Sequence, residues 1–178
     1  ELPRHGVVNL HGSLLPCYRG AAPVNWAIAN GESRSGVCTM RIDAGLDTGP
    51  VYEYDSTDIG PDETAPELHD RLAAMGATTL LRTIDAINRG DAKGRPQDDS
   101  LATLAPPLRK QDGQIRWEEP AEAIHNKVRA FVPWPSVVVE QPAESGEQQA
   151  RGGGHFARAG SSHRQIPAMP ALNRRVVS

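Results

Sequence analysis

A short apolar run that ends in polar residues constrains the fold of this chain more than any other feature of its sequence. Residues 7–10 (Val-Val-Asn-Leu) have the composition of a buried strand, and His11-Gly12-Ser13 breaks the run. In an open α/β sheet, ligands bind at the carboxyl ends of strands, because loops there gather polar groups over a rigid scaffold. The run therefore predicts a strand that carries Asn9 and His11 to a binding site.

The segments after this run alternate between helical and strand patterns, which is typical of an α/β fold. The two strands that follow are joined by a Gly-rich and Asp-rich loop and are expected to pair as a hairpin. Thr64 and Glu67 form a capping box ahead of a long helix, and Gly90 suits its end. The expected elements are a helix over 22–30, strands over 37–42 and 51–55, and a helix over 65–88 with Leu68, Leu72, Met75, Leu80, Ile84 and Ile87 on one face.

Composition divides the chain into four parts. Residues 1–90 carry the α/β pattern, and residues 91–110 are rich in Gly, Pro, Gln, Asp and Ser, which is typical of an extended linker. Residues 141–178 have no periodic pattern, so we expect them to be disordered. A second unit is expected over 111–140, with a strand at 115–117, a helix over 120–130 and a strand at 137–139.

The charge balance and the cysteines exclude several classes of protein. With 19 basic and 22 acidic residues, the chain is not a bulk polyanion binder, so any contact with nucleic acid must be local. Cys17 and Cys38 lack metal-ligand spacing, which predicts no structural metal and fits a reducing, cytoplasmic setting. No apolar run is long enough to span a bilayer. The start, Glu1-Leu2-Pro3, lacks an initiator Met and indicates a chain that begins inside a larger protein.

Asn9, His11 and Asp47 are the candidates for chemistry. Side chains at alternate positions of a strand point to the same side, so Asn9 and His11 can face one pocket, where an amide beside an imidazole can stabilise a negative oxygen. The glycines of the 43–50 loop permit turns that bring the Asp47 carboxylate to the same edge, where it would favour the charged imidazolium. Singly, each residue also fits an ordinary role: a loop histidine, a turn-forming aspartate and an asparagine that caps a strand.

The loop after the first strand suits a flat ligand that carries an anionic group. Arg19 and Gly20 would let a cation and bare backbone approach the anionic group. The ligand itself would be gripped by the backbone amides and apolar side chains of Ser13, Leu14, Leu15 and Pro16.

Three segments together resemble the signature blocks of the formyltransferase family, in the family's order and spacing. They are residues 11–16 (His-Gly-Ser-Leu-Leu-Pro), 19–23 (Arg-Gly-Ala-Ala-Pro) and 43–49 (Asp-Ala-Gly-Leu-Asp-Thr-Gly). The resemblance covers roughly residues 6 to 139. The segment 129–135 (Arg-Ala-Phe-Val-Pro-Trp-Pro) is similar to the members that act on methionyl-tRNA.

Several features depart from the family. Cys17 stands where a basic residue is common, the family's first strands have no counterpart here, and the tail after about residue 141 does not resemble the remaining barrel strands.

The resemblance implies the second half of a Rossmann-like catalytic domain, a linker and the start of a small OB-like β-barrel domain. It implies a monomeric, metal-free enzyme of translation initiation that moves a formyl group from 10-formyltetrahydrofolate to the amino group of initiator methionyl-tRNA. Asn9 and charged His11 would stabilise the oxyanion, and Asp47 would keep His11 charged and take part in proton transfer. Folate would contact Ser13, Leu14, Leu15, Pro16 and Asp43.

Two alternatives stay open at this point. The first is another formyltransferase or hydrolase of the same fold, acting on a glycinamide ribonucleotide, a nucleotide sugar or water. The second is an inactive fragment, because a parallel sheet without its initial strands exposes apolar edges and leaves the core incomplete. We therefore expect the isolated chain to be unstable or inactive.

Overall fold

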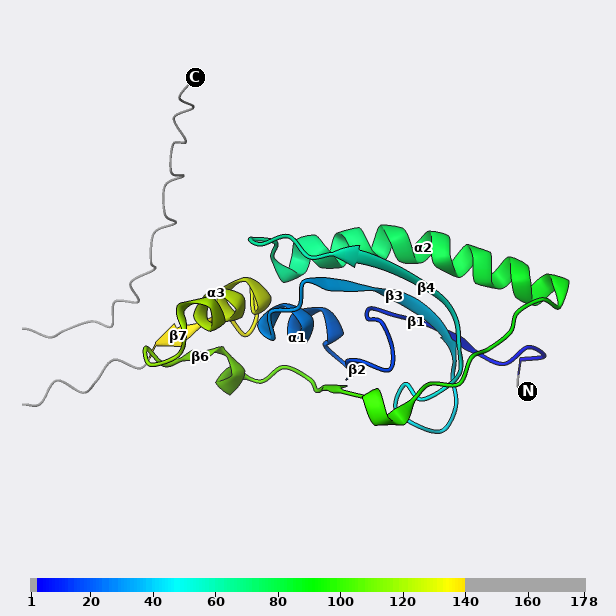
Figure 1. Ribbon diagram of the computed structural model, residues 1–178, viewed down its shortest axis with the longest axis horizontal. Helices are drawn as coiled ribbons and strands as arrows, with labels where there is room; N and C mark the ends of the chain where they lie inside the picture. Colours follow the sequence, from blue (N-terminus) through cyan, green and yellow to red (C-terminus); the bar gives the residue numbers. More distant parts are fainter. Residues whose placement is uncertain (1–2, 140–178) are drawn as a thin grey trace, which may run out of the picture. The chain divides into compact units, whose positions relative to one another are not determined.

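The computed structural model describes residues 3–139 (Figure 1). The described residues belong to one compact unit. The expected disorder of residues 141–178 and the later barrel strands lie outside the described residues. In residues 3–139, no helix is both long and apolar enough to cross a membrane.

The main sheet has the strand order β1-β3-β4, with both neighbouring pairs antiparallel. Its strands are β1 (Val8–His11), β3 (Arg34–Arg41) and β4 (Val51–Asp58). The expected strand ahead of His11 and the expected hairpin are confirmed, and both hairpin strands are longer than the sequence predicts. In the register, Asn9 lies opposite Met40 and His11 opposite Cys38, so the candidate residues sit at alternate positions of a paired strand.

The long helix α2 (Ala65–Arg89) packs against β3 and β4 and lies along them in Figure 1. At its start the Glu67 carboxylate accepts hydrogen bonds from the Thr64 backbone N–H at 2.8 Å and from the Thr64 hydroxyl at 2.7 Å. At its end Gly90 adopts a left-handed φ of 79°, which satisfies the last carbonyls. Both boundaries agree with the prediction.

The buried face of α2 changes character along the helix. Leu68 and Leu72 are buried as expected, but Ile84 is 42% exposed, so that part of the expected apolar face is wrong. The second half buries Thr79 and Thr83 instead. These hydroxyls form hydrogen bonds with polar groups on the sheet. Thr83 Oγ1 lies 2.6 Å from Thr39 Oγ1, and Thr79 donates to Asp55 at 2.5 Å.

The helices α1 (Pro23–Ala29) and α3 (Ala121–Ala130) pack against each other. Trp26 meets Phe131 edge to face at 5.8 Å between ring centroids, and Asn25 Nδ2 donates to the Ala130 carbonyl at 2.7 Å. The strands β6 (Gln114–Ile115) and β7 (Val138–Val139) form a parallel pair beside α3. Residues 111–139 therefore contact residues 3–90 directly, and the expected division into two domains stays a prediction.

The segment expected to be an extended linker is fixed to residues 3–90. It contains the 3₁₀ helix η1 (Asp99–Leu101) and strand β5 (Leu104–Ala105), and the 3₁₀ helix η2 (Lys110–Gly113) follows it. Strand β5 pairs in parallel with β2 (Arg19–Gly20). Upstream, Arg95 and Val51 exchange two backbone hydrogen bonds of 2.8 and 2.9 Å. Residues 95–105 thus belong to the same folded structure as residues 3–90.

The buried hydroxyl pair predicts a non-additive effect on stability. Thr83→Val removes the hydrogen-bond partner of the Thr39 hydroxyl, so the free energy of unfolding should fall by about 1–3 kcal/mol. Thr39→Val/Thr83→Val removes both hydroxyls and should recover most of that loss. Urea denaturation measures both, and a double variant as unstable as the sum of the single variants would contradict the coupling.

Candidate functional site

Asn9, His11 and Asp47 line one pocket of about 350 Å³, so the structure brings together the three residues that the sequence singles out. The pocket lies between the end of β1, the turn into α1, the 43–50 loop and the first turns of α2. The other lining residues are Leu10, Gly12, Gly20, Ala21, Ala22, Pro23, Val24, Asn25 and His69.

His11 is 5% exposed and its ring is oriented by two neighbours. Nε2 lies 2.9 Å from the Tyr18 carbonyl oxygen, which only accepts, so Nε2 carries a hydrogen. Nδ1 lies 3.7 Å from Asp47 Oδ2. Because Nε2–H is already committed to the backbone, any hydrogen bond from His11 to a ligand oxygen must come from Nδ1 of a doubly protonated ring.

Asp47 is held from both its side chain and its backbone. Its Oδ2 accepts a hydrogen bond of 2.9 Å from the Gly20 N–H, and its carbonyl accepts one of 2.7 Å from Gln97 Nε2. Gly20 has a φ of +125°, and a Cβ there would lie 2.5 Å from the Ala105 carbonyl oxygen. Only glycine therefore fits where the donor to Asp47 must sit.

Asn9 completes the site with a side-chain amide on the pocket wall. Among residues 3–139, no side-chain hydrogen bond to its amide is present, and the residue is partly exposed on the pocket wall. An uncommitted amide beside an imidazole and a carboxylate can bind an oxygen that becomes negative and can move a proton nearby.

Arg19 does not act as a free cation for an anionic ligand, so that part of the sequence interpretation is wrong. Its side chain is 8% exposed and is used inside the protein. Nη2 lies 2.7 Å from Asp99 Oδ1 and donates to Gln97 Oε1 at 2.8 Å. The guanidinium group of Arg19 is therefore already bound by residues of the 91–110 segment, which the sequence predicts to be a linker.

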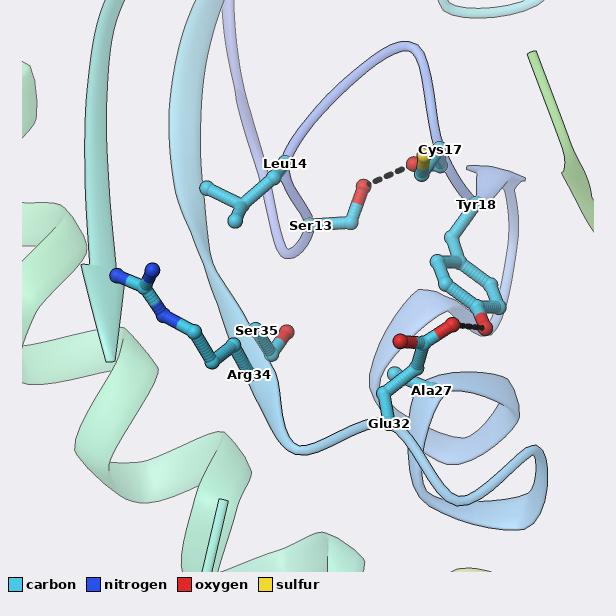
Figure 2. Close-up of a pocket in the computed structure, with 8 residues that line it drawn as sticks. All are labelled: Ser13, Leu14, Cys17, Tyr18, Ala27, Glu32, Arg34 and Ser35. Atoms are coloured by element: carbon cyan, nitrogen blue, oxygen red, sulfur yellow. Dashed lines mark hydrogen bonds between the residues drawn. The ribbon is translucent and has the colours of Figure 1, made fainter. Parts of the chain in front are cut away.

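The five expected folate contacts lie in other places. As far as the described residues form it, the wall of the 350 Å³ pocket contains none of them. Ser13 and Leu14 line a second pocket of about 210 Å³. Figure 2 shows this pocket, with the Ser13 hydroxyl bonded to the Cys17 carbonyl at 2.6 Å and the Tyr18 hydroxyl bonded to Glu32 at 2.7 Å.

The remaining three expected contacts shape loops in this structure. Leu15 is 3% exposed and packs with the buried side chains of β3 and β4. The Pro16 carbonyl accepts from the Thr103 N–H at 3.3 Å. Asp43 accepts from the Gly45 N–H at 3.0 Å and the Thr48 hydroxyl at 2.7 Å, and the Thr48 hydrogen bond lowers the pKa of its carboxyl. Whether these residues also touch folate stays a prediction.

Two residues near the site were not anticipated. His69, an exposed residue of α2, lines the pocket. Gln97 was placed in a linker, yet its side chain bonds the Asp47 loop. His69 follows the buried Leu68 in a helix whose start is marked by the capping box, so the face of the helix that carries His69 could be predicted. No sequence pattern marks the contact that Gln97 makes.

Cys38 predicts a difference in reactivity between the two thiols. It is fully buried opposite His11, and burial raises its pKa to about 12, so very little thiolate forms at about pH 8. Iodoacetamide should alkylate Cys17 of the folded chain and leave Cys38 unmodified, with both modified after denaturation. Peptide mass spectrometry reads the two sites separately, and equal rates in the folded chain would contradict the burial.

Two solved structures of formyl-transferring enzymes have a similar fold. One is WlaRD, a sugar 3N-formyl transferase solved in the presence of dTDP and 5-N-formyl-THF, with a TM-score of 0.67 and 28% identity over 71% of this chain and 46% of its own. Another is the N-formyltransferase from Helicobacter canadensis in complex with folinic acid and dTDP-3-aminofucose, with a TM-score of 0.67 and 26% identity over 71% and 47%. The fold is therefore that of an α/β one-carbon transferase.

Sequence comparison defines the family. A family model described as formyl transferase matches residues 1–84, and one described as formyl transferase, C-terminal domain, matches residues 107–145; together they cover more than half of the chain. The chain belongs to the formyl transferase family.

Two curated relatives of the chain are both named methionyl-tRNA formyltransferase. Methionyl-tRNA formyltransferase from Solibacter usitatus (strain Ellin6076) is 56% identical over 135 residues, which are 76% of this chain and 43% of the relative. Methionyl-tRNA formyltransferase from Geobacter metallireducens is 52% identical over the same shares. The chain thus spans less than half the length of these relatives.

Proposed function

We propose that this chain carries the catalytic residues for transfer of a formyl group from 10-formyltetrahydrofolate to the amino group of methionyl-tRNA. The observation that carries the proposal is the convergence of Asn9, His11 and Asp47 in one pocket of a formyl transferase fold. The names of the 56% and 52% identical relatives support methionyl-tRNA as the acceptor.

Each of the three residues has a distinct role in the proposed reaction. As the amine nitrogen attacks the formyl carbon, negative charge grows on the formyl oxygen, and the Asn9 amide and His11 Nδ1–H donate to it. The Asp47 carboxylate, 3.7 Å from Nδ1, stabilises the doubly protonated His11 ring. Asp47 also accepts, through water, the proton that the attacking amine must lose. When the bond from the formyl carbon to folate N10 breaks, N10 keeps the electron pair and takes up that proton, so that tetrahydrofolate leaves.

The folate co-substrate is proposed on two grounds. The neighbours WlaRD and the Helicobacter canadensis enzyme were solved with 5-N-formyl-THF and folinic acid. In this chain, Ser13 and Leu14 border a partly apolar pocket on the loop that follows β1, which suits one side of a flat ring system. We further propose a monomeric, metal-free enzyme of cytoplasmic translation initiation.

A chimera tests the function without depending on the isolated chain. Residues 3–139 replace the matching segment of the Solibacter usitatus relative, and transfer of labelled formyl to methionyl-tRNA is followed. We expect transfer by the chimera, and weak or absent transfer by the 178-residue chain alone. If neither protein formylates methionyl-tRNA while the parent relative does, the proposed function is wrong.

Substitutions in the chimera test the site. Asn9→Ala removes one donor to the developing oxyanion and should lower kcat by about 10²–10³-fold. Asp47→Asn removes the proton acceptor and the charge beside His11, and should lower kcat by about 10²–10⁴-fold. Asp85→Asn, the same chemical change on an exposed position of α2, serves as the control and should leave kcat unchanged. Full activity of Asp47→Asn would remove Asp47 from the mechanism.

The acceptor has one serious alternative, a nucleotide-linked amino sugar. One structural neighbour is a sugar 3N-formyl transferase, and the other was solved with dTDP-3-aminofucose. The same assay with dTDP-linked amino sugars in place of methionyl-tRNA separates the two acceptors. Formylation of the sugar and not of the tRNA would assign the chain to that other class of formyltransferase.

A further inference from the structure

Asp47 has an unusual backbone conformation in a largely exposed loop. Its φ is +51°, in the left-handed region that residues with a side chain rarely adopt. Most of the loop around it, over residues 43–46, is exposed. A conformation of this kind persists only when surrounding contacts hold it in place.

Gln97 supplies those contacts from fifty residues further along the chain. Its Nε2 donates to the Asp47 carbonyl at 2.7 Å and to the Gly49 carbonyl at 2.8 Å. Its Oε1 accepts from Arg19 Nε at 3.1 Å and Nη2 at 2.8 Å. The orientation of the amide is fixed, because a flipped amide would face two carbonyls with its oxygen and a guanidinium with its NH₂ group.

Residues on both sides of Gln97 are themselves anchored, one by its backbone and one by its side chain. Two residues before it, Arg95 pairs with Val51 at the start of β4. Two residues after it, Asp99 binds the buried Arg19 at 2.7 Å. Gln97 is therefore held in place independently of the loop that it binds, so it can determine where that loop lies.

We propose that Gln97 is a positioning residue, which fixes the Asp47 carboxylate between the Gly20 N–H and His11 by holding the Asp47 and Gly49 carbonyls. Gln97 is not among the described residues that line the pocket, so its effect on the site passes through the Asp47 loop. The catalytic consequence rests on the proposed function of Asp47; the structural consequence does not. A displacement of about 1 Å in a reacting group lowers rates by about 10²-fold, so the hold on Asp47 affects turnover rather than substrate binding.

Gln97→Glu tests the hold on the loop. Glutamate keeps the shape and can still bind Arg19, but it has no hydrogen to donate to the two carbonyls. In the chimera, which supplies the rest of the fold, the NMR order parameters of the Asp47 and Gly49 amides should fall from about 0.85 to below about 0.6. Gln111→Glu, the same change on an exposed position of η2, should leave them unchanged. Gln97→Met repeats the test without a new charge, in case Gln97→Glu does not fold.

The kinetic test uses the formyl-transferring chimera. Gln97→Glu should lower kcat by about 10–100-fold and leave KM for both substrates within about twofold. Added to Asp47→Asn, it should lower activity no further, because both changes act on the same group. Asp99→Asn, which weakens the neighbouring Arg19 contact and leaves the Asp47 loop untouched, should have a smaller effect than Gln97→Glu.

The outcomes separate this proposal from the proposed function. Unchanged order parameters in both Gln97 variants would overturn the hold on the loop. A loosened loop with unchanged kcat, or a loss that adds fully to that of Asp47→Asn, would overturn the positioning role. A parent chimera that transfers no formyl would refute the proposed function, and the NMR comparison would still decide whether Gln97 fixes Asp47.

Discussion

The hydrogen bond from the Gly20 N–H to the Asp47 carboxylate joins the parts of this structure that matter for chemistry. Gly20 lies on β2, which pairs with β5, and Asp47 lies in the loop between β3 and β4. The same carboxylate oxygen lies near His11 at the end of β1. The pocket is therefore built where three separate backbone segments meet, and a displacement of any one of them changes the distance between the carboxylate and the imidazole.

Local patterns in the sequence were sufficient for most of the secondary structure. The two ends of α2 could be predicted from Thr64 and Glu67 at its start and the left-handed Gly90 at its end, because these residues act on neighbouring backbone groups. The buried face of α2 was only partly predictable. Thr79 and Thr83 face polar groups on the sheet, and no pattern within the helix shows what lies opposite. The helical period predicts which side chains share a face of the helix, whereas the burial of that face depends on the surface packed against it.

The candidate site divides in the same way. Asn9 and His11 could be placed on one side of a strand because strand geometry alternates. The hydrogen on His11 Nε2 could not be predicted, because it depends on a carbonyl seven residues away at Tyr18, whose φ is +62°. The roles of Arg19 and Gln97 were hidden for a related reason. Polar composition marks a segment as exposed, and it does not reveal side chains that bind a distant backbone.

The distribution of the tryptophans gives this chain a built-in optical reporter. Trp117 and Trp134 are 71% and 52% exposed, so a polar quencher in solution reaches both rings. Trp26 lies against Phe131, and its Nε1 donates to the Pro106 carbonyl at 2.8 Å. Emission that survives quenching therefore comes mainly from Trp26, so it reports on the contact between α1 and the residue that follows α3.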